Sequence, residues 1–359
     1  MASPPSNDSL PHPNSIEGSR FWAVLIGIDA YPSSPLNGCV SDALAMKEYI
    51  TNDLGVPEDH IQCLLSASYQ PSSQSDDNDT PLVDNGVHSH PGVQSGAISV
   101  DDSSNPTRTN IVETLLGLST SPLIQKDDII IIYFAGHGSI YLCSDYHQLK
   151  PNQTVRSISS RGSIEALCPV DRNSSTNNGA AIPDISDREI NIILSEISRN
   201  KGHRITFIAD CCHSSGVTRD VTTPFNVRRA KPLPPTSIQV MLQAAHARLK
   251  ELSSYRSVFE GNWNPDKESH VVLAACAEFQ HAKEDKGASG WNGVFTQALI
   301  NALKSKDLKE QATYTDLILA LEMPSNIGQT PVVAGMHMNA RLWYQDYTDS
   351  FYNRGCHIL

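Results

Sequence analysis

Two short segments of the chain carry residue types that can perform covalent catalysis. The segment Gly136-His137-Gly138 follows one apolar run, and the segment Asp210-Cys211-Cys212 follows another. A thiol within hydrogen-bond reach of an imidazole is the arrangement for thiolate catalysis, because the imidazole can accept the thiol proton and later protonate a leaving amine. The backbone N–H groups of Gly138 and Cys212 can then bind the oxyanion that forms on a substrate carbonyl. The pattern predicts a catalytic pair of His137 and Cys212.

Each segment also has a purely structural interpretation. Glycines on both sides of His137 permit a tight turn whatever the histidine does, and free cysteine is among the most buried residue types. The consecutive residues Cys211, Cys212 and His213 could also hold a metal ion, although adjacent cysteines cannot easily both point at one ion. Catalysis requires that the strands preceding the two segments be neighbours in one sheet, so that both segments emerge at the same edge.

The apolar pattern predicts the elements that position these segments. Continuous apolar runs indicate buried strands at residues 21–28, 61–65, 129–134, 205–210 and 270–276. Apolar residues at helical spacing indicate helices within residues 41–51, 107–118, 183–197, 238–252, 295–303 and 314–321, and polar residues at 144–163 indicate a loop. Strands that alternate with helices predict an α/β fold, with a mainly parallel central sheet flanked by helices on both faces.

Composition and charge exclude several functional classes. The net charge is −12 and the pI is about 5.5, whereas non-specific nucleic-acid binding needs a basic footprint, so we expect no nucleic-acid partner. The sequence has no run of about 18 apolar residues that could span a membrane, and its polar N-terminus lacks the apolar region of a signal peptide. We therefore expect a cytoplasmic protein that could also occur in the nucleus. In these reducing compartments, most of the eight cysteines should be reduced thiols.

Taken together, the motifs resemble those of the caspase clan, and within it the metacaspases of fungi, plants and protists. The histidine and cysteine segments stand in the family's order along the chain. Further segments that resemble the metacaspase pattern lie at residues 36–43, 106–111, 167–171, 274–277, 292–296 and 329–331. The resemblance covers about residues 20–343, apart from an insertion and a linker.

This resemblance implies a caspase–hemoglobinase fold and a cysteine endopeptidase. It places the nucleophile two residues after an aspartate, so Cys212 and not Cys211 is the expected nucleophile. It also implies a monomer, whereas caspases dimerise. Two alternatives stay open: a catalytically silent caspase-fold scaffold that binds partners, and a hydrolase or ligase of the same clan that acts on other acyl groups.

The resemblance further implies a substrate pocket for a basic side chain. The metacaspase pattern places the pocket acids at Asp42 and Asp210, with Cys39 nearby. Carboxylates at the floor of such a pocket select Arg or Lys, so we expect basic-residue-containing protein or peptide substrates. In the alternative interpretation, Asp42 caps a helix and Asp210 braces a loop. The family often has Ser where this chain has Ala135, and the missing hydroxyl is expected to weaken Lys relative to Arg.

The resemblance raises the question of calcium activation. The cysteine–histidine chemistry itself requires no cofactor. Many metacaspases bind calcium through a cluster of carboxylates, and Asp187 and Asp220 fall near the expected places. Two carboxylates do not suffice for a hard divalent ion, so calcium is expected at most as an activator. The absence of a CxxC pair argues against a structural zinc site.

The chain divides into regions that we expect to form one compact catalytic domain. These are a disordered tail (1–20), a large catalytic region (21–216) with a mobile insertion (about 70–107), a linker (217–268) and a small-subunit-like region (269–359). The linker is rich in proline and contains Arg219, Arg228, Arg229 and Lys231, so we expect it to be exposed and basic. An Arg/Lys-specific protease could cut itself after one of these residues, which would make the chain a self-processing zymogen.

Overall fold

A six-stranded sheet forms the centre of the protein. The computed structural model describes residues 17–67, 102–149, 162–175, 179–212, 226–277, 280–287 and 290–345. The sheet has the order β12-β9-β7-β3-β1-β2, and its neighbours run parallel except for β9 and β12. Its strands are β1 (Phe21–Ile28), β2 (Ile61–Ser66), β3 (Ile129–Ala135), β7 (Ile205–Asp210), β9 (Val271–Ala274) and β12 (Val332–Ala334). The predicted α/β class with a mainly parallel sheet is confirmed.

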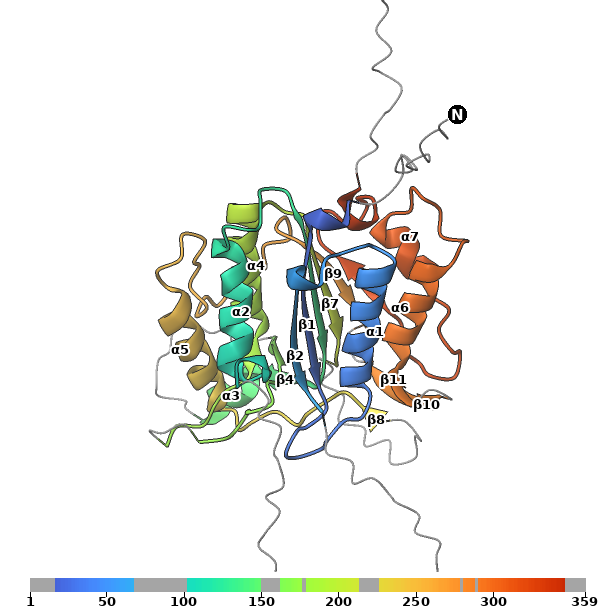
Figure 1. Ribbon diagram of the computed structural model, residues 1–359. Coiled ribbons are helices and arrows are strands. Elements are labelled where there is room, and N and C mark those ends of the chain that lie inside the picture. Colours follow the sequence, from blue (N-terminus) through green and yellow to red (C-terminus); the bar gives the residue numbers. More distant parts are fainter. Residues whose placement is uncertain are drawn as a thin grey trace, which may run out of the picture.

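Helices cover both faces of this sheet, as Figure 1 shows. One face carries α1 (Cys39–Asn52), α6 (Val294–Lys304) and α7 (Tyr314–Leu319), and the other carries α2 (Arg108–Thr120), α4 (Asp187–Lys201) and α5 (Ser237–Leu249). β1 and β3 are buried along their whole length because helices lie on both sides of them. The Thr107 side chain caps α2 by accepting a hydrogen bond from Asn110 N, and Ser186 caps α4 in the same way.

Two small antiparallel sheets extend the carboxyl edge of the central sheet, and the sequence pattern did not predict them. One contains β4 (Gly138–Leu142), β5 (Ser163–Leu167) and β6 (Ile185–Ser186), and the other contains β8 (Asn226–Val227), β10 (Lys283–Gly287) and β11 (Gly290–Gly293). These strands are short: the longest apolar run among them is the three residues Ile140, Tyr141 and Leu142 of β4, and β10 is largely charged. The loop expected at 144–163 is also partly wrong, because α3 (Cys143–Leu149) forms there.

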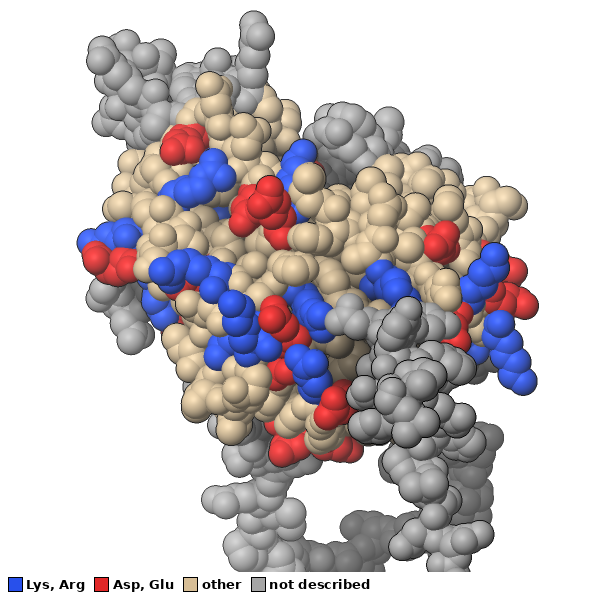
Figure 2. Space-filling model, turned by 90° about the horizontal axis from the view of Figure 1, so that it is seen from above, with Lys and Arg blue, Asp and Glu red and all other residues tan. Residues whose placement is uncertain are grey.

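The end of the central sheet where β1 begins carries charges of both signs. Short 3-10 turns complete the fold at η1 (Gly18–Arg20), η2 (Glu58–His60), η3 (Asp102–Ser104) and η4 (Leu342–Tyr344). Figure 2 views the molecule from the end where β1 begins, and lysines and arginines there are intermixed with aspartates and glutamates. The described part of this face therefore has no uniform basic surface of the kind that binds nucleic acid. Among the described residues, no helix has the length and apolar character needed to cross a bilayer.

Candidate active site

The fold brings the histidine and cysteine segments to one edge of the sheet. β3 and β7 are neighbours, and their register pairs Ala135 with Asp210. His137 and Cys212 each lie two residues beyond this pair, at the carboxyl ends of the strands. Both side chains are buried, with 2% and 0% of their surface exposed. The predicted neighbourhood of the two segments is therefore present in the structure.

The surroundings of His137 fix which ring nitrogen can act as a base. Nε2 lies 2.7 Å from the carbonyl oxygen of Ser34, which can only accept a hydrogen bond, so Nε2 carries the proton. Tyr31 holds the turn: its hydroxyl accepts from His137 N and donates to the carbonyl of Cys168, both at 2.9 Å. Nδ1 is the free base and has no hydrogen-bond partner among the described residues. Burial lowers the pKa of His137 to about 4.

The thiol of Cys212 is turned toward Ala282 and not toward His137. Cys212 Sγ accepts a hydrogen bond from Ala282 N at 2.7 Å and lies 3.3 Å from the carbonyl oxygen of the same residue. Burial raises the pKa of this thiol well above its usual value, and the neighbouring Cys276 raises it further. Thiol and imidazole are thus both neutral in this state, and the imidazole must act as a general base for the thiol to become a nucleophile.

An arginine from the linker lies among three carboxylates beside this pair. Arg228 is completely buried, although the composition of the linker predicted exposure, so that prediction is wrong for Arg228. Its guanidinium forms ion pairs with Asp42, with Asp210 at 2.7 Å and with Glu284 at 3.3 Å. Burying a guanidinium requires such partners, and these carboxylates come from three separate elements. We call Asp42, Asp210 and Glu284 the acidic cluster.

Each acid of the cluster is held in place by its own neighbours. Asp42 accepts two hydrogen bonds from the backbone N–H of Gly293, at 2.8 and 3.0 Å, and Asp210 accepts one from the hydroxyl of Thr296 at 2.6 Å. A Cβ atom on Gly293 would lie 2.5 Å from both Arg228 and Asp210, so only glycine fits there. Burial raises the pKa of Asp42 to about 7, although Arg228 opposes that shift.

The main chain of Arg228 is bound as closely as its side chain. Its carbonyl oxygen accepts hydrogen bonds from the backbone N–H groups of Gly138 and Cys212, each at 3.1 Å. These are the two groups that the sequence suggested for an oxyanion site. Arg228 N donates to the carbonyl of Ala282 at 3.0 Å, and the preceding β8 pairs antiparallel with β10. The linker therefore crosses the site in the extended form in which proteases hold a peptide.

Glu284 is the functional candidate that sequence reasoning missed. It accepts hydrogen bonds from the backbone N–H groups of Gly38 and Asn37, at 2.9 and 3.2 Å, as well as pairing with Arg228. Cys39, which the sequence placed near the pocket, contacts Glu284 through its thiol at 3.5 Å. Glu284 lies in a charged segment that matches no catalytic motif, so only its position in the fold identifies it.

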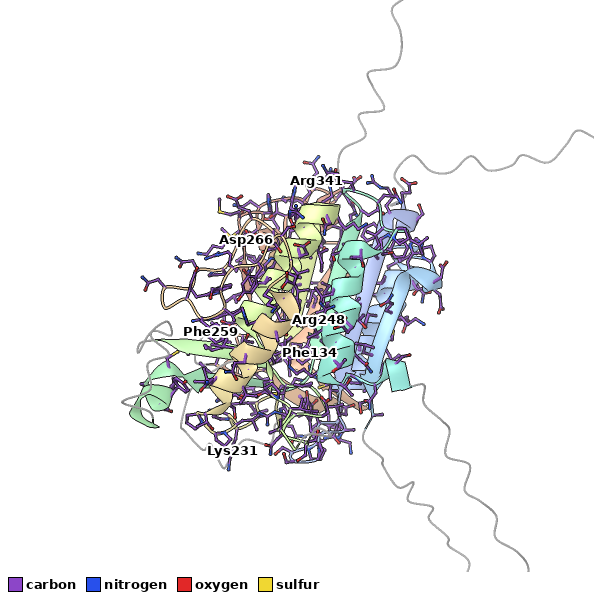
Figure 3. The ribbon with its side chains drawn as sticks, turned by 90° about the vertical axis from the view of Figure 1, so that its left-hand side faces the viewer. Phe134, Lys231, Arg248, Phe259, Asp266 and Arg341 are labelled. Atoms are coloured by element: carbon purple, nitrogen blue, oxygen red, sulfur yellow. The ribbon has the colours of Figure 1, made fainter. Side chains whose placement is uncertain are left out.

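Three of the remaining predicted residues fall within the described part of the chain. Arg229 is half-buried, whereas Lys231 is exposed and lies at the lower edge of the molecule in Figure 3. Asp187 is exposed in the first turn of α4. Arg219 and Asp220 fall outside the described residues.

One group of possible metal ligands occurs within the described ranges, and it lies beside the acidic cluster. It consists of Asp29, Cys39 and Glu284. Asp29 accepts hydrogen bonds from the backbone N–H groups of Cys39 and Val40, at 2.8 and 3.2 Å. The carboxylates of Asp29 and Glu284 thus bind backbone N–H groups at the start of α1, and this role explains why they lie close together.

The chain is similar to several known proteins. The chain is 23% identical over 377 residues to Metacaspase-1 of Saccharomyces cerevisiae, a match that covers 94% of this chain and 74% of the yeast protein. It is 27% identical over 198 residues to Metacaspase-9 of Arabidopsis thaliana, covering 54% of this chain and only 43% of the plant protein. A crystal structure of a Geobacter sulfurreducens protein superimposes with a TM-score of 0.50 at 17% identity, covering 89% of this chain and 97% of that one.

The family model of the caspase domain matches residues 20–338. This match includes every described strand of the central sheet together with the histidine and cysteine segments. The chain therefore belongs to the caspase domain family of cysteine-type peptidases, as the sequence motifs predicted.

Proposed function

We propose that this protein is an endopeptidase that cleaves after arginine, and that residues 226–230 occupy its site as a substrate does. The observation that supports this most strongly is the double engagement of Arg228. Its side chain lies in the acidic cluster while its carbonyl accepts hydrogen bonds from Gly138 N and Cys212 N. When the specificity pocket binds the side chain of a residue and the oxyanion site binds its carbonyl oxygen, that residue is in the position of the one whose carbonyl is attacked.

The proposed reaction begins with movement of the Cys212 thiol away from Ala282. His137 Nδ1 takes the thiol proton while Sγ forms a bond to the carbonyl carbon of the arginine. The N–H groups of Gly138 and Cys212 stabilise the resulting oxyanion. His137 then gives its proton to the amide nitrogen of the residue that follows the arginine. The C–N bond of that amide breaks, and the amine leaves. Water hydrolyses the thioester with His137 again acting as the base.

The acidic cluster favours arginine over lysine in this proposal. A planar guanidinium presents several donors in a fork, so it can meet carboxylates from different directions at once. Arg228 does this with three carboxylates. The compact ammonium of lysine reaches less far, and Ala135 offers no hydroxyl to replace the missing contacts.

Self-processing follows from the same geometry. Of the three described linker residues considered as cleavage sites, Arg228 is the one whose carbonyl lies at the oxyanion groups. We propose that the uncut chain is latent because its own linker fills the site, and that cleavage between Arg228 and Arg229 opens it. We further propose that the protein acts as a monomer, needs no metal for the chemistry, and uses calcium, if at all, as an activator.

The activity is tested with purified wild-type protein and a Cys212→Ala variant. Fluorogenic peptides ending in Arg, Lys or Asp are offered with and without calcium. We expect hydrolysis of the Arg peptide above the Lys peptide, no hydrolysis of the Asp peptide, and loss of all activity in the variant. Hydrolysis that survives the Cys212→Ala change, or a preference for Asp, would overturn the proposal. No hydrolysis by the wild-type protein after its linker has been cut would support a scaffold that binds partners.

A further inference from the structure

Residues 229–233 of the linker continue past Arg228 along a second set of contacts. Ala230 N donates a hydrogen bond to the carbonyl oxygen of Gly138 at 2.9 Å, and the carbonyl of Lys231 accepts one from Arg172 Nη2 at 3.1 Å. Leu233 N donates to the hydroxyl of Tyr141 at 3.3 Å. The segment is therefore held by its main chain at Ala230, Lys231 and Leu233, within the five positions that follow the Arg228–Arg229 bond.

We propose that Tyr141, Arg172 and Asp184 form a binding site for the part of a protein substrate that follows the cleaved bond. We call these three residues the leaving-side site. The proposal rests on the proposed function, because it treats the linker as a bound substrate. It adds that the enzyme recognises an extended chain on both sides of the bond, and not only the arginine that precedes it.

A buried carboxylate orients this site. Asp184 is fully buried and accepts a hydrogen bond from Tyr141 Oη at 2.6 Å and two from the Arg172 guanidinium at 2.8 Å each. The tyrosine proton is thus directed at Asp184, which leaves the hydroxyl oxygen to accept from a peptide N–H. The bidentate pair likewise fixes the guanidinium plane, so that one N–H of Arg172 points at a peptide carbonyl. Groups fixed before binding lose little entropy when a peptide arrives.

The burial of the linker side chains indicates which sequences fit. Ala230 and Leu233 are 7% and 8% exposed, whereas Lys231 and Pro232 between them are exposed. The second position after the bond therefore demands a small side chain, because a larger one would have to displace packed atoms. The fifth position favours an apolar side chain of about the size of leucine. The exposed third and fourth positions impose no comparable demand.

Gly138 connects the two halves of this recognition. Its N–H binds the carbonyl of Arg228 and its carbonyl binds the N–H of Ala230. A chain bound at both points has the intervening bond held at the oxyanion groups, as productive orientation requires. Peptides that end at the arginine can use only the first of these contacts.

The test compares a short and a long substrate on the processed wild-type enzyme. The short one is acetyl-Asn-Val-Arg coupled to a coumarin, and the long one is an internally quenched peptide with the sequence of residues 226–233. In Tyr141→Phe, the ratio of kcat/KM for the long to the short substrate is expected to fall about threefold to tenfold, mainly through KM, because one hydrogen bond is lost. Tyr146→Phe is the matched control. Tyr146 lies in α3, and its hydroxyl contacts Gln239 of α5 at 3.2 Å and not the linker, so the ratio should stay unchanged.

Changes in the peptide test the same contacts without altering the enzyme. N-methylation at the leucine position removes the donor to Tyr141 and should weaken the long substrate on the wild-type enzyme, with no further loss on Tyr141→Phe. Alanine replaced by leucine at the second position should weaken it as well. An unchanged ratio in Tyr141→Phe, or equal hydrolysis of all long peptides, would overturn the leaving-side site alone. Failure to hydrolyse the short substrate would instead contradict the proposed function.

Discussion

Three arginines with little exposed surface pair with carboxylates in two different proportions. Arg172 pairs with Asp184 at 2.8 Å and Arg108 pairs with Glu189 at 2.6 Å, so each of these arginines has one carboxylate partner in an ion pair among the described residues. Arg228 pairs with three. The first two pairs balance their charge, whereas the acidic cluster retains an excess of acid even when Arg228 is in place.

This difference distinguishes a contact that only holds the fold from a site that can exchange one bound cation for another. A balanced buried pair neutralises itself, and removing either partner leaves an uncompensated charge in the interior. A cluster with surplus carboxylates can accept a cation from outside, and the raised pKa of Asp42 reflects this surplus together with burial. The Arg108–Glu189 pair, which is not part of the proposed leaving-side site, should therefore govern stability, and the acidic cluster should govern which side chain precedes the cleaved bond.

Among changes to the acidic cluster, the largest expected effect on activity comes from Asp210→Asn. Asp210 forms an ion pair with Arg228 at 2.7 Å and has no exposed surface. Removing one partner of a desolvated charge pair typically costs a few kcal/mol, so kcat/KM for an arginine peptide should fall at least about thirtyfold. Steady-state kinetics measures this. An unchanged kcat/KM would show that Asp210 braces the loop and does not bind substrate.

A balanced pair should respond in the opposite way. Glu189→Gln leaves Arg108 without a charged partner at the junction of α2 and α4, so the free energy of unfolding should fall by about 3 kcal/mol. The ratio of hydrolysis of Arg to Lys peptides should stay the same. Urea denaturation and peptide kinetics on one preparation test both parts. A changed Arg/Lys ratio would remove the distinction between the two kinds of contact.

Glu284→Gln should have a smaller effect that depends on the substrate. Its carboxylate lies 3.3 Å from Arg228, so an arginine peptide should lose about tenfold in kcat/KM. A lysine peptide, whose ammonium is expected to reach fewer carboxylates, should lose less. Competition between Arg and Lys peptides gives the ratio directly. Equal losses for both would argue that Glu284 only holds the segment at Gly38 in place.

The smallest effect should appear as a dependence of KM on pH. The pKa of Asp42 is raised to about 7 with an arginine in the site, and it is higher in the empty site because the guanidinium that opposes the shift is absent. KM for an arginine peptide should therefore rise as the pH falls toward 7, by at most about tenfold per pH unit for one proton, and should level off below pH 7. In Asp42→Asn this slope should disappear. A slope that persists in the variant would assign it to another group.

The sequence predicted one part of the site well and another part badly, for a physical reason. Asp210 ends an apolar strand, and His137 and Cys212 each follow an apolar strand by two residues, so the apolar runs and their order along the chain were enough to predict that these residues lie close together. Arg228 and Glu284 lie in polar segments, and their burial depends on partners far away in the chain: Arg228 and Asp42 are 186 residues apart. The composition of a segment predicts its exposure only when the segment is considered by itself. It does not predict that a two-residue strand such as β8 pairs with a charged strand such as β10.

The central claim is that the bond between Arg228 and Arg229 lies in the catalytic position. The direct measurement is mass spectrometry and N-terminal sequencing of the fragments that form when purified wild type, Cys212→Ala and Arg228→Gln are incubated under assay conditions. We expect a wild-type fragment that begins at Arg229 and is absent from both variants. Wild-type cleavage at another linker residue, with unchanged fragments from Arg228→Gln, would contradict the account.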